Sequence, residues 1–238
     1  MKIIALDSSG LTASVAIVED DVTIAEYSVN YKKTHSQTLI PMLDEIRKMT
    51  ECDLSTIDAI AIAKGPGSFT GLRIGSASAK GLGFALGVPI VEVSTTEALA
   101  YRFYGTDKIV CPMMDARRNQ VYTGIYEFIY HNDPVLNTVL DASAMDVEEI
   151  ICKINSLGRA VIFTGDGVPV YKEAITAQVK VEAFFAPSHL NRQSAATVGA
   201  VGIIKAKRGE TVLPEAHVPE YLRLSQAERE RNEAIHES

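Results

Sequence analysis

A chain of 238 residues with 47% hydrophobic and 22% charged residues has an ordinary composition for a globular protein, and it can bury one large core or two smaller lobes. Its formal net charge of −7 argues against strong nucleic-acid binding by this chain alone, because phosphate neutralisation requires clustered Lys and Arg. The widely spaced cysteines show no metal-ligand pattern, and we find neither a signal peptide nor a run of about 20 apolar residues, so we expect a cytoplasmic protein without a membrane segment.

The first half of the chain alternates apolar strands with helices. In chain order it predicts strands at 2–6, 13–18 and 22–29, a helix at 36–49, a strand at 58–63, a helix that ends near 87, a strand at 88–93 and a helix at 94–103. In the helix at 36–49, Leu39, Leu43 and Ile46 recur at helical spacing and form an apolar face. Pro41 lies inside that helix and should bend its first turns.

A glycine-rich segment precedes and fills the second helix. Small residues recur there at intervals of four, at Gly71, Gly75, Ala79 and Gly83. They therefore lie along one stripe of the helix, although each glycine costs about 1 kcal/mol relative to alanine. A face without side chains allows another backbone to approach closely, so we expect a packing surface, either inside the lobe or between subunits.

The second half repeats the pattern of the first hairpin. Strands predicted at 108–114 and 120–128 flank a polar turn in which Asp115 takes the position that Asp7 takes in the first hairpin. The sequence further predicts a helix that ends near residue 155, a strand at 159–164 and helices near 168–177 and 194–207. Two such units predict an α/β protein with the duplicated two-lobe fold of actin-like ATPases. We expect an N-terminal lobe at 1–103, a C-terminal lobe at 104–224 and a polar tail at 225–238.

The glycine-rich loop opens a helix in the manner of a phosphate-binding loop. It lacks the Gly-Lys-Ser/Thr ending of a Walker A loop, and Thr70 stands where a dinucleotide fingerprint needs its last glycine. We therefore favour a tight turn in which Ser68 or Thr70 caps the helix.

The turn with Asp7, Ser8 and Ser9 has two interpretations that stay open. It either binds a metal–phosphate group or is a turn whose aspartate accepts bonds from local amides. The matching turn holds Arg117 and Arg118 and no small hydroxyl residue, which weakens a two-lobed ATP clamp.

Neither a metal site nor a nucleophile is indicated. The five histidines include no pair at i, i+4, and Leu39 stands four residues after His35. No GxSxG elbow appears, and no cysteine is flanked by an evident base. We therefore expect no metal and no cofactor, while a Ser–His–Asp arrangement assembled in space stays open.

Six segments carry a resemblance to a known family, in the family's order and spacing. They are LDSSGLTASVAI, HSQTLIPMLDEI, GPGSFTGLRIGSASAKGLGFALGVPIVEVSTTEALA, MDARRNQVYTGIYE, FTGDG and PEYLR. From Met1 to about Arg223 the chain resembles the TsaB (YeaZ) family, the dimerisation subunits of the bacterial machinery that makes tRNA threonylcarbamoyladenosine.

The resemblance implies the actin-like fold and a non-catalytic subunit. TsaB-like proteins are paralogues of TsaD, which transfers a threonylcarbamoyl group to adenosine 37 of tRNAs that read codons beginning with A. TsaD-like chains bind a metal with two histidines, where His35 and Leu39 stand here. The resemblance also implies a heterodimer with a TsaD-type subunit, a TsaE-type ATPase in the ternary complex, a homodimer when alone, and at most indirect or weak tRNA contact.

The expected docking surface combines the two first-lobe helices. Its residues are Leu39, Leu43, Ile46, Gly71, Ile74, Gly75, Ser78, Ala79, Leu82 and Gly83. The competing interpretation is that both faces pack inside the chain's own lobe. Two enzyme classes remain as alternatives, a small-molecule kinase or ATPase that uses Asp7, and a metal-dependent peptidase, which the missing ligands disfavour.

Overall fold

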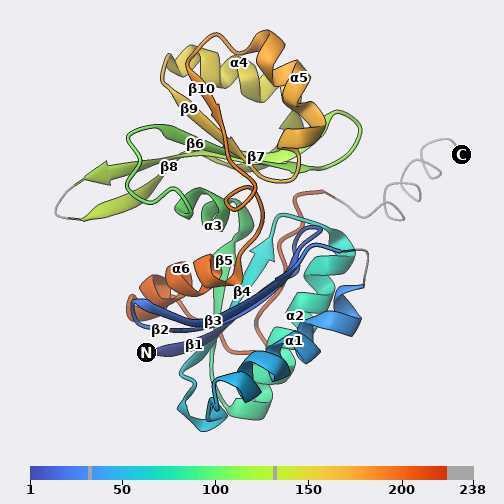
Figure 1. Ribbon diagram of the computed structural model, residues 1–238, viewed down its shortest axis with the longest axis vertical. Coiled ribbons are helices and arrows are strands. Elements are labelled where there is room, and N and C mark those ends of the chain that lie inside the picture. Colours follow the sequence, from blue (N-terminus) through green and yellow to red (C-terminus); the bar gives the residue numbers. More distant parts are fainter. Residues whose placement is uncertain (32–33, 131–132, 224–238) are drawn as a thin grey trace, which may run out of the picture.

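The computed structural model describes residues 1–31, 34–130 and 133–223, which form two lobes stacked along the long axis of the molecule (Figure 1). Each lobe is built on a five-stranded sheet. The first sheet contains β1 (Lys2–Asp7), β2 (Ala13–Glu19), β3 (Val22–Val29), β4 (Ala59–Gly65) and β5 (Ile90–Ser94). The second contains β6 (Ile109–Asp115), β7 (Gln120–Tyr130), β8 (Pro134–Asp146), β9 (Val161–Thr164) and β10 (Ala183–Phe185).

The two sheets share one topology. The strand orders are β3-β2-β1-β4-β5 and, read from the corresponding edge, β8-β7-β6-β9-β10. In each sheet the first three strands in sequence pair antiparallel and the last two join in parallel. The predicted α/β architecture with duplicated lobes and actin-like topology is confirmed.

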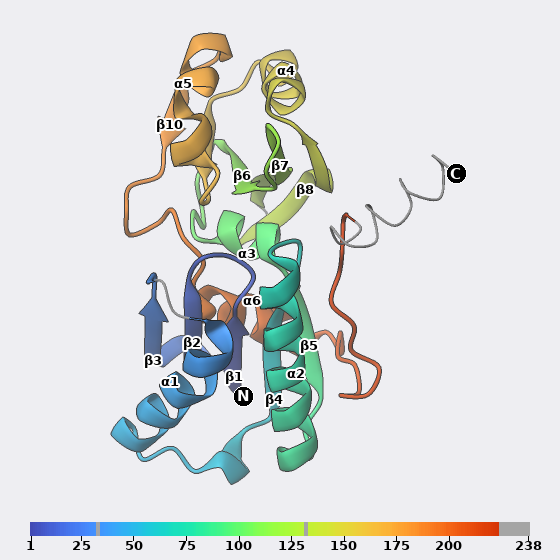
Figure 2. The same cartoon turned by 90° about the vertical axis from the view of Figure 1, so that its right-hand side faces the viewer.

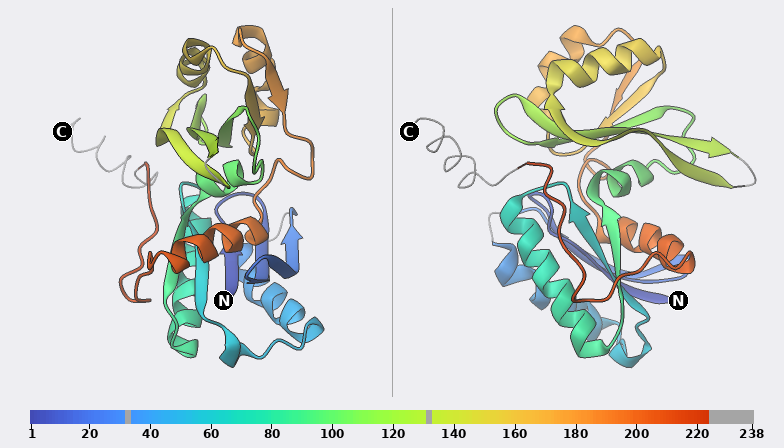
Figure 3. Two further views of the ribbon diagram at one scale, coloured as in Figure 1. Left: turned by 90° about the vertical axis from the view of Figure 1, so that its left-hand side faces the viewer. Right: turned by 180° about the vertical axis from the view of Figure 1, so that it is seen from behind.

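Helices cover both faces of the first sheet (Figure 2). On one face lie α1 (His35–Met49) and α2 (Phe69–Leu86), whose apolar residues share a core with β1, β2 and β4. On the other face lies α6 (Ala195–Lys207), together with the short α3 (Thr95–Tyr101). In the second lobe α4 (Val147–Leu157) and α5 (Val168–Gln178) cover one face of the sheet, as Figure 3 shows.

The position of α6 differs from the predicted division of the chain. It was expected in the C-terminal lobe at 104–224, but it packs on the first sheet. Its glycines make this contact possible, because an added Cβ on Gly199 would lie 2.5 Å from Val18 Cγ2, and one on Gly202 would lie 2.8 Å from Ala61 Cβ. The first lobe therefore consists of the N-terminal part of the chain and α6. The expected tail at 225–238 lies outside the described residues.

Candidate functional site

The turn after β1 is internally bonded. Asp7 is buried, and its Oδ1 accepts hydrogen bonds from Ser9 N at 2.9 Å and from Ser9 Oγ at 2.6 Å. Burial raises the pKa of Asp7 to about 6, although the bonds from Ser9 act in the opposite direction. Ser8 Oγ donates to the carbonyl of Gly71 at 2.8 Å. This pattern matches the interpretation of the turn as a local structural one.

The glycine-rich loop lies directly on that turn. Ser68 N donates to Ser9 O at 2.7 Å, and an added Cβ on Gly67 would lie 2.3 Å from the same oxygen. An added Cβ on Gly71 would lie 2.1 Å from Ser8 O. Ser68 Oγ accepts from Gly71 N and so caps α2, as the favoured interpretation expected. The two backbones are in direct contact at these positions, which matches a tight turn.

The small-residue stripe of α2 continues this contact. An added Cβ on Gly75 would lie 2.4 Å from Ser8 Oγ, and one on Gly83 would lie 2.9 Å from Pro214 Cγ. Ala79 has no exposed surface. Close backbone approach therefore occurs inside the lobe, and the prediction that Gly71, Gly75, Ala79 and Gly83 face a partner is wrong.

The predicted apolar positions of α1 are buried as well. Leu39, Leu43 and Ile46 are at most 6% exposed and pack into the first-lobe core. The prediction that these three residues contact a partner is therefore also wrong. The remaining predicted positions, Ile74, Ser78 and Leu82, are only half-buried and lie at the margin of the exposed side.

Facing away from the core, α2 presents a second surface that the sequence analysis did not single out. We define the outer face of α2 by its exposed residues Arg73, Ala77, Gly81, Phe84 and Ala85. Gly81 has no atom within 4 Å of an added Cβ, and Phe84 is 61% exposed. The only feature of the sequence that could have indicated this surface is the four-residue spacing of Ala77, Gly81 and Ala85. The inner face of α2 has the same spacing of small residues, so the spacing does not distinguish the two faces.

Other large apolar side chains of the first lobe are exposed as well. On α1 these are Ile40 and Met49, and the first-lobe loops add Leu11 and Tyr31.

A cleft of about 640 Å³ separates the two hairpin turns. The first lobe lines it with Ser9, Gly10, His35 and Ser68, among others, and the second lobe with Asp115, Arg117, Tyr122 and Asp166. His35 Nε2 lies 2.8 Å from Gly10 O, a bond that fixes the ring against the first hairpin.

The second-lobe side of the cleft is also internally bonded. Asp166 Oδ1 accepts from Asp115 N at 3.3 Å, and burial raises the pKa of Asp166. Asp115 Oδ1 accepts from Tyr171 Oη at 3.0 Å and from Arg117 N at 2.8 Å. Within the described parts of the chain, no group of three or more His, Cys, Asp or Glu is arranged to hold a metal ion.

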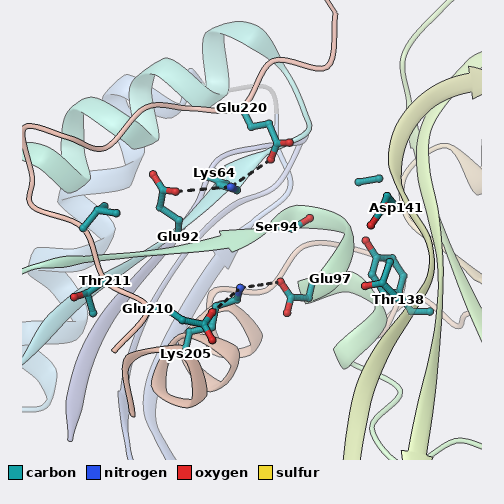
Figure 4. A pocket seen from close by; sticks show the side chains of 13 residues that line it. Lys64, Glu92, Ser94, Glu97, Thr138, Asp141, Lys205, Glu210, Thr211 and Glu220 are labelled. Atoms are coloured by element: carbon teal, nitrogen blue, oxygen red, sulfur yellow. Dashed lines mark ion pairs between the residues drawn. The ribbon is translucent and has the colours of Figure 1, made fainter. Parts of the chain in front are cut away.

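A second cavity, of about 700 Å³, lies on another side of the lobe junction (Figure 4). Two lysines each form ion pairs with two carboxylates of this cavity. Lys64 pairs with Glu92 at 3.7 Å and with Glu220 at 3.6 Å. Lys205 pairs with Glu97 at 3.6 Å and with Glu210 at 3.5 Å. On the opposite wall, β8 contributes Thr138 and Asp141. The charges are mostly paired within the wall, and no sequence pattern had indicated this cavity.

No helix in the described residues is both long and apolar enough to cross a membrane. A family model described as TsaD, tRNA N6-adenosine threonylcarbamoyltransferase, matches residues 23–231.

Named relatives give a more specific match. The chain is 34% identical to the tRNA threonylcarbamoyladenosine biosynthesis protein TsaB of Bacillus subtilis (strain 168), over 96% of this chain and 96% of the relative. It is also 34% identical to the protein of the same name from Escherichia coli (strain K12), over 53% of this chain and 55% of the relative. Among solved structures, YeaZ from Pseudomonas aeruginosa superposes with a TM-score of 0.77 at 28% identity, covering 93% of this chain and 99% of YeaZ.

Proposed function

Since this chain belongs to the TsaB family of tRNA threonylcarbamoyladenosine biosynthesis proteins, we propose that it works without catalytic residues of its own, as the docking partner of a TsaD-type threonylcarbamoyltransferase. It is an accessory subunit of that tRNA modification pathway, and the resemblance predicted from the sequence is confirmed. The similarity to the Bacillus subtilis protein along almost the whole of both chains is the observation that carries this assignment. The alternative as a small-molecule kinase is not favoured.

The geometry of the first hairpin supports the absence of catalysis. Asp7 and Ser9 bond to each other, and Gly67 lies against the carbonyl of Ser9, so the polar groups of the turn and the backbone of the loop are engaged with each other. Leu39, which stands in the expected place of a metal-binding histidine, is buried in the apolar core. These features suit a subunit that contributes a surface rather than a reaction centre.

The outer face of α2 is the surface that best fits a docking role. Ala77, Gly81 and Ala85 leave the helix backbone accessible, and Phe84 projects beside them. A helix of a partner can approach such a face closely, as small residues permit, and can bury the exposed aromatic ring. We propose that a TsaD-type subunit docks on this face and that a second copy of this chain occupies the same face when no TsaD-type subunit is present. A TsaE-type ATPase joins the heterodimer without displacing the TsaD-type subunit.

A pair of matched substitutions tests this assignment. Ala77→Arg places a long charged side chain on the outer face of α2, and Ala177→Arg places the same side chain on the exposed side of α5 in the second lobe. We expect Ala77→Arg to weaken binding of a TsaD-type subunit at least about tenfold in calorimetry, because an unpaired charge must be buried. Ala177→Arg should bind like the unmodified chain. Equal affinities for both variants would contradict the proposed docking face.

Activity provides a second test. The chain alone should not modify tRNA, whereas adding it to a TsaD-type subunit, a TsaE-type ATPase and the activated threonylcarbamoyl donor should restore threonylcarbamoyladenosine at position 37. Ala77→Arg should reduce this activity and Ala177→Arg should leave it unchanged. Turnover by the isolated chain, lost on Asp7→Ala, would instead favour an enzyme.

A further inference from the structure

The segment after α6, residues 210–223, runs along the first lobe toward the second with one turn at 214–216, and we call it the strap (Figure 3). It begins at the edge strand β5, where Val212 and Ile90 exchange both backbone hydrogen bonds at 2.9 Å. Farther on, Glu220 N donates to Lys64 O at 2.8 Å, at the end of β4. The bonds to Ile90 satisfy backbone groups of the edge strand that would otherwise be unpaired, and the bond to Lys64 anchors the strap at the end of an inner strand.

The strap also follows α2 along most of its length. Pro214 packs against Gly83 near the end of the helix. Near the beginning, the rings of Tyr221 and Phe69 lie 4.8 Å apart, and Arg73 Nε donates to Tyr221 Oη at 3.3 Å. The Arg73 guanidinium also lies 4.0 Å above the ring of Phe69. Through Tyr221, the strap therefore binds Arg73, which is a residue of the outer face of α2.

At its described end the strap reaches the second lobe. Arg223 Nη1 donates to the carbonyl of Ala116 at 2.8 Å. Ala116 belongs to the turn after β6, whose next three residues, Arg117, Arg118 and Asn119, have φ of 65°, 55° and 60°. Ala116 and Arg117 line the cleft between the lobes. The bond from Arg223 thus joins the two lobes at the cleft wall.

Val212 is half-buried against the first-lobe core, but otherwise few apolar contacts hold the strap in place. Among its described residues only Pro214 and His217 are buried, whereas Leu213 and Val218 are 62% and 64% exposed. His217 Nδ1 lies 2.6 Å from Glu92 Oε1, but its Nε2 is buried without a hydrogen-bond partner. A segment with little buried apolar surface and an unsatisfied buried nitrogen opens at low cost.

We propose that the strap is a releasable clasp between the lobes and that docking on the outer face of α2 opens it. Arg73 belongs to that face and is bonded to Tyr221, so a partner that takes over Arg73 competes with the strap. Tyr221 and Arg223 are two residues apart, and loss of the first contact frees the second to leave Ala116. The inference rests on the proposed docking function for its trigger, and the clasp itself can be tested without a partner.

The first experiment measures the distance between the lobes in the isolated chain. Spin labels on Cys152, which is exposed on α4, and on an introduced Asp21→Cys report it by double electron–electron resonance, since the other native cysteines are buried. Arg223→Ala should broaden and lengthen the distance distribution, and Arg223→Lys should largely restore it. Arg159→Ala, which removes a bond to Glu127 inside the second lobe, should leave it unchanged. Identical distributions for the wild type and Arg223→Ala would overturn the clasp.

The second experiment adds a TsaD-type subunit. It should shift the wild-type distribution in the same direction as Arg223→Ala, and Tyr221→Ala should bind the subunit about fivefold more tightly, because coupling between two sites is reciprocal. Binding without any change in distance would overturn the release. Absence of binding would contradict the proposed function together with the trigger, while the first experiment still decides whether the clasp exists.

Discussion

On its inner face α2 presents Gly71, Gly75 and Gly83 at multiples of four residues, and on its outer face it presents Ala77 and Gly81 at the same interval. The inner glycines lie against Ser8 and Pro214, whereas Gly81 has nothing within reach of an added Cβ. One helix thus uses small residues twice, for close packing inside the lobe and for an accessible backbone outside it. Spacing predicts a stripe, and only the surroundings decide its role.

The same substitution on the two faces is the strongest way to test this difference. Gly75→Leu should lower the free energy of unfolding by more than about 3 kcal/mol, because its Cβ alone would meet Ser8 Oγ at 2.4 Å. Gly81→Leu, the control, should leave it unchanged or slightly raised, since leucine favours helix. Chemical denaturation measures both. A similar loss for the two variants would contradict the distinction, and any loss of partner binding by Gly75→Leu would reflect unfolding.

A second prediction concerns the turn beneath the inner face. In the folded state the pKa of Asp7 is about 6, above the ordinary value of 3.8. Asp7 therefore stabilises the fold most at low pH, and this contribution to the free energy of unfolding is lost as the pH rises from about 4 through 6. Asp7→Asn keeps an oxygen that accepts from Ser9 and does not titrate. Between pH 4 and 7 the stability of the variant should therefore rise by about 2 to 3 kcal/mol relative to the wild type. A constant difference in denaturation at both pH values would contradict the raised pKa.

The smallest expected effect is a gain on the outer face. Gly81→Ala should raise the free energy of unfolding by about 0.5 to 1 kcal/mol, because alanine favours helix and meets open space there. Gly71→Ala is the matched change on the inner face and should destabilise, since its Cβ would lie 2.1 Å from Ser8 O. Thermal unfolding of both variants checks the signs. A loss for Gly81→Ala would show that the outer face is packed in solution.

Much of the fold could be predicted from local pattern. The repeated strand–turn–strand units, with Asp7 and Asp115 at equivalent positions, led to the duplicated lobes. The 13-residue β8 was missed, because few of its residues are buried and its polar and apolar positions do not alternate regularly. The three-residue β10 was too short to give a pattern. β8 forms the edge of the sheet beside β7, the strand that precedes it, whereas β10 pairs in parallel with β9 across the intervening helix α5.

The candidate site was harder to predict, because it depends on which surfaces meet in space. Chain order placed α6 in the second lobe, whereas its contacts place it on the first sheet. The stripe of α2 was recognised, but its orientation followed from contacts with Ser8 and Pro214, which lie more than 60 residues away in sequence. The strap gave no periodic signal, since its bonds are made mostly by backbone and isolated side chains.

The return of α6 to the first sheet has a consequence for synthesis on the ribosome. One face of that sheet is covered by Ala195, Val198 and Val201, which are made only after the second lobe has been translated. The second lobe, by contrast, is encoded by the uninterrupted stretch between α3 and α6. Because domains fold as units while the chain is being elongated, the second lobe should reach its native state first, and the first lobe should wait with an apolar surface uncovered until α6 has been made.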